Sequence, residues 1–265
     1  MAPTVSAPSI LKRLTKGDAE PVLVADFQAW TTAPRLSRLL SRRAEGHPVH
    51  QVDPIGVLSG DRPYLPLQDL AEFCAAEFLA SDPVGGPVFI VGHCSASALS
   101  LHVADLLGEA RDVTTILVGP VWPDLSHVQR RFAETLANLG AAARPCPDLD
   151  GDPIAAVARM EHVLQAEVDA LAASRGLDST ADAFSELLGW YRGWLAFLLA
   201  CDNDPHKTWE NARTKVVALA APADHVTIPG LSADAYQIEE VPALAQDEPI
   251  TPELAAAVLA QMARR

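Results

Sequence analysis

The chain has 265 residues, of which 49% are hydrophobic and 6% aromatic, so it can bury a large core as one domain with an insertion. Its 34 acidic and 20 basic residues give a formal net charge of -14, which disfavours nucleic acid and anionic membranes as partners because both are polyanions. No apolar run approaches the roughly 20 residues of a membrane-spanning helix, and the first residues lack the apolar core of a secretory signal. We therefore expect a cytoplasmic protein.

Strand and helix patterns alternate along the first half of the chain. Residues 1–20 are polar, contain prolines and predict an N-terminal arm. Patterns typical of buried strands occur at 21–27, 48–56, 87–92 and 113–119. Apolar residues recur at helical spacing in 34–46, 67–81 and 97–110. This order predicts an α/β fold with a mostly parallel central sheet flanked by helices.

The alternation stops at 124–210, where only helical patterns occur. A strand pattern returns at 215–225, and 251–265 predicts a closing helix with an acidic start and a basic end. The order of sheet, helices and sheet predicts a core at 21–123 and 211–265, with a helical lid insertion at 124–210.

The four cysteines are far apart and form no Cys-x-x-Cys pair. They are Cys74, Cys94, Cys146 and Cys201. In a reducing compartment this spacing argues against both a disulfide framework and a zinc knuckle. Each cysteine is therefore interpreted singly.

Cys94 has the most informative surroundings, because a buried strand pattern and a helix pattern meet at Gly-His-Cys-Ser-Ala. A strand-to-helix turn this sharp needs small residues two before and two after its apex, and Gly92 and Ala96 supply them. The apex side chain then projects over the sheet at a helix N-terminus, which favours an anion, and the amide of Ser95 can donate to an oxyanion. Cys94 is thus a candidate nucleophile. The alternative is a small buried cysteine in a tight turn.

Residues 65–107 resemble the thioesterases of nonribosomal peptide and polyketide assembly lines, with their helix, Gly-Pro step, strand, Gly-His-Ser-x-Gly elbow and helix. The resemblance implies an α/β-hydrolase fold and a lid that encloses an acyl chamber. It also implies a substrate carried on the phosphopantetheine of an acyl or peptidyl carrier protein, and no bound cofactor. Cys94 stands where the family usually has serine, and Ala96 where it has glycine.

The chain departs from that family at its acid, its base and its oxyanion loop. No carboxylate follows the strand near Gly119, so Asp224, after the later strand, is the candidate acid. The triad order places the base last, but no histidine follows His225, which is therefore the candidate base. The family's second oxyanion amide would come from Gln28 or Ala29, in a loop that is not rich in glycine.

His93 occupies the variable position of the elbow motif. It is a candidate for substrate contact, and a structural histidine is the alternative. The aromatic residues of the insertion, Trp190, Tyr191, Trp194 and Phe197, fit either packing of the lid or the wall of an acyl pocket.

A cysteine without a general base favours acyl transfer over hydrolysis. An acyl group on cysteine is itself a thioester, so exchange with a pantetheine thioester is nearly thermoneutral, whereas hydrolysis needs a base to activate water. The chain accordingly resembles the cysteine-dependent aminoacyl shuttle enzymes of assembly lines. A thioester hydrolase, a hydrolase similar to the cysteine-dependent dienelactone hydrolases, and a noncatalytic protein that binds an acylated carrier are the alternatives.

Overall fold

The computed structural model describes residues 9–27, 34–60, 62–83, 85–177, 182–204, 209, 214–244 and 250–264. The chain divides into two units, which we call the core unit and the helical unit. The core unit comprises Ile10–Asp53, Leu67–Trp122 and Asp204–Arg265, and the helical unit includes Pro54–Pro66 and Pro123–Asn203. The expected division into arm, core and lid stays a prediction, because the two units do not show what role each part of the chain has.

The core unit is built on a sheet of seven strands within the described residues, in the order β1-β3-β2-β4-β5-β6-β7. All neighbouring strands are parallel except β1, which pairs antiparallel with β3. The strands are β1 Leu11–Arg13, β2 Val22–Ala25, β3 Val49–Val52, β4 Val88–His93, β5 Val113–Val118, β6 Thr214–Ala220 and β7 Tyr236–Glu240. The central strands are almost entirely buried and apolar, as expected of parallel strands covered on both faces. The predicted mostly parallel α/β sheet is confirmed.

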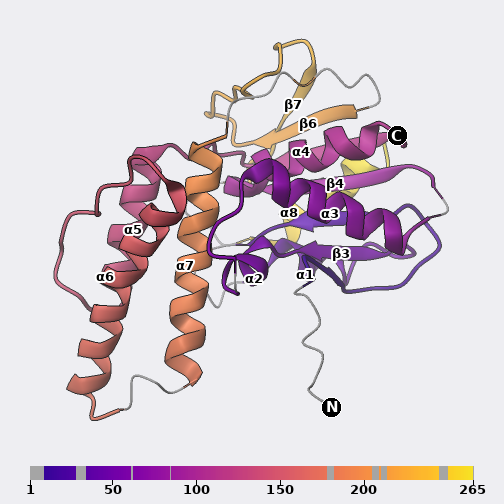
Figure 1. Ribbon diagram of the computed structural model, residues 1–265. Coiled ribbons are helices and arrows are strands. Elements are labelled where there is room, and N and C mark those ends of the chain that lie inside the picture. Colours follow the sequence, from indigo (N-terminus) through magenta and orange to yellow (C-terminus); the bar gives the residue numbers. More distant parts are fainter. Residues whose placement is uncertain are drawn as a thin grey trace, which may run out of the picture. The chain divides into compact units, whose positions relative to one another are not determined.

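Helices cover both faces of this sheet. Helices α1 (Leu36–Leu40) and α8 (Pro252–Met262) pack on one face, in a cluster that includes alternate residues of β2, β4, β5 and β6. Helix α4 (Ser97–Gly108) packs on the other face through Leu101, and α3 (Leu67–Ser81) packs beside it. Figure 1 shows α3 and α4 in front of the sheet and α8, in yellow, behind it.

Three local predictions need correction. Leu11–Arg13 form the edge strand β1, where we expected part of an arm; the pattern was too short and too polar to indicate a strand. The strand predicted at 48–56 ends at Val52, and α2 (Pro54–Leu58) follows because proline cannot donate to a ladder but suits a helix start. Strand β7 was not predicted, since a half-exposed edge strand lacks a continuous apolar run.

The helical unit contains α2 and the long helices α5 (Leu125–Asn138), α6 (Pro153–Ser174) and α7 (Asp182–Asp202). Helix α7 packs against α2, α5 and α6. Arg192 of α7 joins these parts, because its Nη1 lies 2.9 Å from Glu161 Oε1 and its Nη2 donates to the carbonyl of Gly60 at 2.8 Å. Among the described residues, no helix has both the length and the apolar character needed to cross a membrane.

The aromatic residues of α7 stack on one another. The rings of Trp190 and Trp194 are 6.3 Å apart at an interplanar angle of 16°, and those of Trp194 and Phe197 are 6.4 Å apart at 19°. Trp194 and Phe197 are buried, whereas Trp190 is half-buried. Stacking in the interior of the helical unit therefore accounts for most of this aromatic stripe.

Candidate functional site

The loops that could carry chemistry leave the sheet at one edge. Ala25 pairs with Gly92, and Val118 pairs with both His93 and Leu219, so the carboxyl ends of β2, β4, β5 and β6 lie side by side. In an open α/β sheet, ligands bind at this edge. The segment that follows β4 begins with Cys94.

Cys94 has the strained backbone of a sharp strand-to-helix turn. Its φ is 54°, and among the described residues it is the one non-glycine residue with positive φ. Such a conformation costs on the order of 1–3 kcal/mol and persists only where the surroundings enforce it. A single 3₁₀ turn, Cys94–Ala96, separates β4 from α4. The backbone therefore forms the sharp turn that the pattern of glycine, cysteine and alanine predicts. The role of Cys94 as a nucleophile stays a prediction.

Close packing and two hydrogen bonds fix the turn. A Cβ at Gly92 would lie 2.5 Å from Ser100 Oγ and 2.8 Å from Ser100 Cβ, so only glycine fits where α4 crosses the strand end. The carbonyl of Cys94 accepts a hydrogen bond from Ser97 Oγ at 2.8 Å and another from the amide of Val121 at 3.3 Å. The second bond ties the turn to the loop that follows β5.

Cys94 lies three residues before the first residue of α4. Its Sγ is 3.8 Å from Ser95 Oγ, and Ser95 is 3% exposed. Helix α4 begins at Ser97 and is 12 residues long, so its N-terminal dipole favours negative charge at this end. The turn thus presents a thiol where a developing anion is stabilised.

His93 lies just before the apex and is neutral at physiological pH. Burial lowers the pKa of its imidazole to about 4. Along β4, His93 follows the alternation of Phe89 and Val91, which belong to the cluster on the α1 and α8 face. This placement favours a packed histidine below the elbow over a substrate contact.

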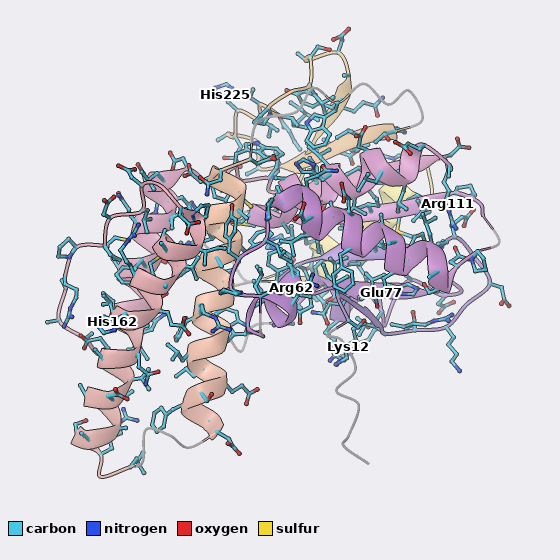
Figure 2. All side chains as sticks on the ribbon, viewed as in Figure 1. Lys12, Arg62, Glu77, Arg111, His162 and His225 are labelled. Carbon is cyan, nitrogen blue, oxygen red and sulfur yellow. The ribbon has the colours of Figure 1, made fainter. Side chains whose placement is uncertain are left out.

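Asp224 and His225 lie on the loop that follows β6, and both are exposed. The amide of Asp224 donates to the carbonyl of Ala221 at 2.9 Å, which closes a turn. Figure 2 shows His225 at the periphery, on the loop between β6 and β7. In the described part of the chain no hydrogen bond joins Asp224 or His225 to Cys94, and their roles as acid and base stay predictions.

The family of the chain follows from comparison with known proteins. A family model described as "Alpha/beta hydrolase family" matches residues 24–254. The chain belongs to the alpha/beta hydrolase family. No match was found among curated proteins.

Solved structures share the alpha/beta hydrolase fold. A four-domain nonribosomal peptide synthetase bound to AMP and glycine aligns at a TM-score of 0.63 and 14% identity over 97% of this chain, which spans 20% of that synthetase. The Vlm2 thioesterase domain with a bound dodecadepsipeptide aligns at 0.57 and 17% identity, over 97% of this chain and 98% of that one. A putative alpha/beta hydrolase from Desulfitobacterium hafniense aligns at 0.51 and 16% identity, over 96% and 98%. At these identities the likeness shows the fold alone.

This alpha/beta hydrolase has no carboxylate directly after β5. Gly119 takes a φ of 52° there, and its amide donates to the carbonyl of Leu219 at 2.9 Å, which continues the pairing of β5 with β6. The predicted oxyanion residues Gln28 and Ala29 lie outside the described residues. Their role stays a prediction.

Asp26 is a buried carboxylate at the same edge of this alpha/beta hydrolase, and sequence reasoning missed it. It follows β2 directly and is 0% exposed. Its Oδ2 accepts a hydrogen bond from the amide of Ser37 at 2.5 Å, whereas its Oδ1 has no hydrogen-bond partner among the residues that the structure describes. Burial raises the pKa of this carboxyl. A lone acid directly after an apolar strand was the signal that could have revealed it.

A cavity of about 560 Å³ lies at the opposite edge of the sheet. Its lining includes Pro21, Pro48 and Pro87, which precede β2, β3 and β4. Cys94 follows β4, so this cavity is not where the thiol would act. In the described part of the chain no three histidine, cysteine, aspartate or glutamate side chains form a group that could hold a metal ion.

Proposed function

We propose that this chain transfers an acyl or aminoacyl group between carrier-protein thioesters through a thioester on Cys94. The observation that carries the proposal is a cysteine held at a φ of 54° at the strand-to-helix turn of an alpha/beta hydrolase. The energy stored in such a conformation is typical of functional positions. The proposed substrate is carried on the phosphopantetheine of an acyl or peptidyl carrier protein.

The reaction has two steps, each a thiol exchange. The sulfur of Cys94 attacks the carbonyl carbon of the donor thioester, the bond from that carbon to the pantetheine sulfur breaks, and the proton of the Cys94 thiol ends on the departing pantetheine thiol. The pantetheine thiol of a second carrier then attacks the carbonyl carbon of acyl-Cys94, the bond from that carbon to the Cys94 sulfur breaks, and the proton of the attacking thiol ends on the Cys94 thiol. Because a thioester replaces a thioester, neither step is strongly downhill. Ser95 and the loop that follows β2 are the proposed oxyanion donors.

Transfer is preferred over hydrolysis because a thiol is nucleophilic without an adjacent base, whereas water is not. A positioned general base contributes about 10²–10⁴ in rate. No histidine follows His225 in the sequence, and His225 and Asp224 make no hydrogen bond to Cys94 among the described residues. Deacylation by water would therefore be slow. If the loop that follows β6 supplies an acid and a base, Asp224 is the proposed acid and His225 is the proposed base.

The comparisons support a thioester substrate. NocB, whose thioesterase domain was solved in covalent complex with a fluorophosphonate nocardicin G analog, aligns at a TM-score of 0.56 and 14% identity over 96% of this chain and 100% of that one. The thioesterase domain of Vlm2 holds a depsipeptide. Together with the four-domain nonribosomal peptide synthetase, these thioesterase domains make a carrier-bound acyl or aminoacyl group the substrate class to test first.

Intact-protein mass spectrometry tests the proposal. The protein is mixed with peptidyl and acyl carrier proteins loaded with acetyl, butyryl, glycyl or alanyl groups, and its mass is followed before and after addition of unloaded holo carrier. We expect a mass gain equal to the acyl group, its loss on addition of holo carrier, and the appearance of the acyl group on that carrier.

Two variants locate the adduct. Cys94→Ala should abolish the mass gain. Cys146→Ala should retain it, because burial raises the pKa of the Cys146 thiol to about 11 and keeps that thiol protonated. Release of free acid faster than transfer would instead identify a thioester hydrolase. Absence of any adduct or turnover with every loaded carrier would overturn the enzymatic proposal in favour of a noncatalytic carrier-binding protein.

A further inference from the structure

The turn at Cys94 and the start of α4 carry three serines, whose hydroxyls make different contacts. Ser95, Ser97 and Ser100 are all buried, at 3%, 0% and 1% exposure. The hydroxyls of Ser97 and Ser100 donate to backbone carbonyls, that of Cys94 at 2.8 Å and that of Ala96 at 3.0 Å. The Ser95 hydroxyl instead lies 3.8 Å from the sulfur of Cys94. Of the three serines, Ser95 is thus the one whose side chain contacts the sulfur of the candidate nucleophile.

The contact between Cys94 and Ser95 follows from the strained backbone of the turn. In a regular helix, successive side chains point about 100° apart and do not meet. Cys94 has a φ of 54°, which departs from helical geometry, and Ser95 is the next residue of the 3₁₀ turn. The conformation at the apex of the turn therefore also brings the sulfur within reach of the next hydroxyl.

A hydroxyl suits a sulfur that changes its charge during a reaction. It can accept a hydrogen bond from a thiol or donate one to a thiolate, and the bond to the anion is the stronger. The Ser95 hydroxyl is already in place beside the sulfur, so little reorganisation is needed when charge develops there. Among the described residues, no histidine, lysine or arginine side chain makes a hydrogen bond to the Cys94 sulfur. In that part of the chain, Ser95 is the side-chain partner of the sulfur.

We infer that the Ser95 hydroxyl is a catalytic group, which donates a hydrogen bond to the Cys94 sulfur when that sulfur carries negative charge. The reaction in which it acts rests on the proposed function. In the first step the hydroxyl stabilises the sulfur as a thiolate before the attack, and the thiol proton still ends on the departing pantetheine sulfur. In the second step the sulfur takes the electron pair of the breaking bond to the acyl carbon. The hydroxyl stabilises it until the proton of the attacking thiol arrives, and Ser95 keeps its own proton throughout.

Reaction with dithiodipyridine tests this role, because exchange with that disulfide reports on the Cys94 sulfur without any acyl group. Ser95→Ala removes the hydroxyl and keeps the backbone amide. Without the hydrogen bond the thiolate fraction should fall about 10- to 100-fold, while each thiolate becomes about 3- to 10-fold more nucleophilic, because nucleophilicity follows proton affinity with a logarithmic slope of about 0.5. We therefore expect Ser95→Ala to react about 3- to 10-fold more slowly than the parent at about pH 6, and faster than the parent at about pH 10, where thiols are ionised.

Peptide mass spectrometry follows the mixed disulfide on Cys94 separately from the other cysteines. Ser100→Ala is the matched control, because it removes a similarly buried hydroxyl from α4, and its rates should equal those of the parent at both pH values. Ser95→Thr keeps a hydroxyl beside the sulfur and should also follow the parent. A loss of rate in Ser95→Ala that is the same at both pH values, or no change at either, would overturn the inference.

The acyl adduct separates this inference from the proposed function. Loading of Cys94 by an acylated carrier, together with pH profiles that do not cross, would refute the role of Ser95 alone. Profiles that cross without any acyl adduct would refute acyl transfer and retain the hydrogen bond from Ser95 to the sulfur.

Discussion

Asp204 accepts a hydrogen bond from Nε2 of His102, on the elbow helix α4, at a distance of 2.9 Å. The other ring nitrogen, Nδ1, lies 2.9 Å from Oε1 of Gln68, whose Nε2 donates to Glu72 Oε1 at 2.9 Å. His102 is buried at 2% exposure, and both of its ring nitrogens have side-chain partners.

The contacts of His102 hold two segments at which the chain re-enters the core unit. The core unit resumes at Asp204, directly after the helical unit ends at Asn203. It also resumes at Leu67, and Gln68 is the next residue. Trp209 packs edge-on to the His102 ring at a centroid distance of 4.7 Å. His102 thus holds both re-entering segments to the helix that carries the elbow.

Replacing Asp204 tests how much this contact stabilises the core unit. Asp204→Ala leaves a buried ring nitrogen of His102 without its partner, so we expect the free energy of unfolding to fall by about 1–3 kcal/mol. Urea denaturation measures it. Glu134→Gln, which breaks the exposed Arg131–Glu134 pair, should cost about 1 kcal/mol or less. A similarly small loss for Asp204→Ala would mean that the contact between His102 and Asp204 does not stabilise the core unit.

The Cys94→Ser variant tests whether a base acts at the elbow. A hydroxyl needs a general base where a thiol does not, so acyl transfer should fall by about 100-fold or more, measured in a single turnover with loaded carrier. A fall of less than about tenfold would show that a base is present. The Cys94→Ser/His225→Ala double variant would then identify His225 as that base if the remaining activity disappears.

Gly92→Ala should destabilise the core unit. The new Cβ would lie 2.5 Å from Ser100 Oγ and 2.8 Å from Ser100 Cβ, which forces α4 away from β4 and costs about 1–3 kcal/mol. The same substitution at Gly189, in α7, meets nothing closer than 3.5 Å and should stabilise the protein by up to about 1 kcal/mol through helix propensity. Thermal unfolding of both variants tests whether their stabilities change in opposite directions. A Gly92→Ala variant as stable as the parent would contradict the tight packing of the turn at Cys94.

The low pKa of His93 predicts a loss of stability in mild acid. Its pKa is about 4 in the folded protein and 6.5 ordinarily, so as the pH falls from 6.5 to 4 the unfolded chain binds a proton that the folded protein does not. The contribution lost is about 2 kcal/mol near pH 5 and at most about 3 kcal/mol near pH 4.

The measurement is the urea midpoint of the parent chain and of His93→Gln at neutral pH and at about pH 5. The parent should lose more stability than His93→Gln over that interval. His162→Gln, at an exposed histidine on α6, should lose as much as the parent (Figure 2). Parallel pH profiles for the parent and His93→Gln would show that His93 accepts a proton in the folded state.

The sequence by itself determined the parallel sheet and the turn at Cys94. Continuous apolar runs specify strands that are buried on both faces. Between a strand and a helix, the residues from Gly92 to Ala96 allow few backbone conformations, because steric limits act locally. The edge strands β1 and β7 were missed for the opposite reason. Their pattern is short or half-polar, and only pairing with a neighbouring strand makes them strands.

Only the tertiary structure decided which groups meet. Asp224 and His225 have the chain order of an acid and a base, yet they lie on an exposed loop without a hydrogen bond to Cys94 among the described residues. Asp26, His102 and Asp204 gave no strong pattern, because their importance comes from partners 11, 34 and 102 residues away. Burial and long-range contact are properties of the folded chain, and they set charge and proton affinity in ways that local residue order does not encode.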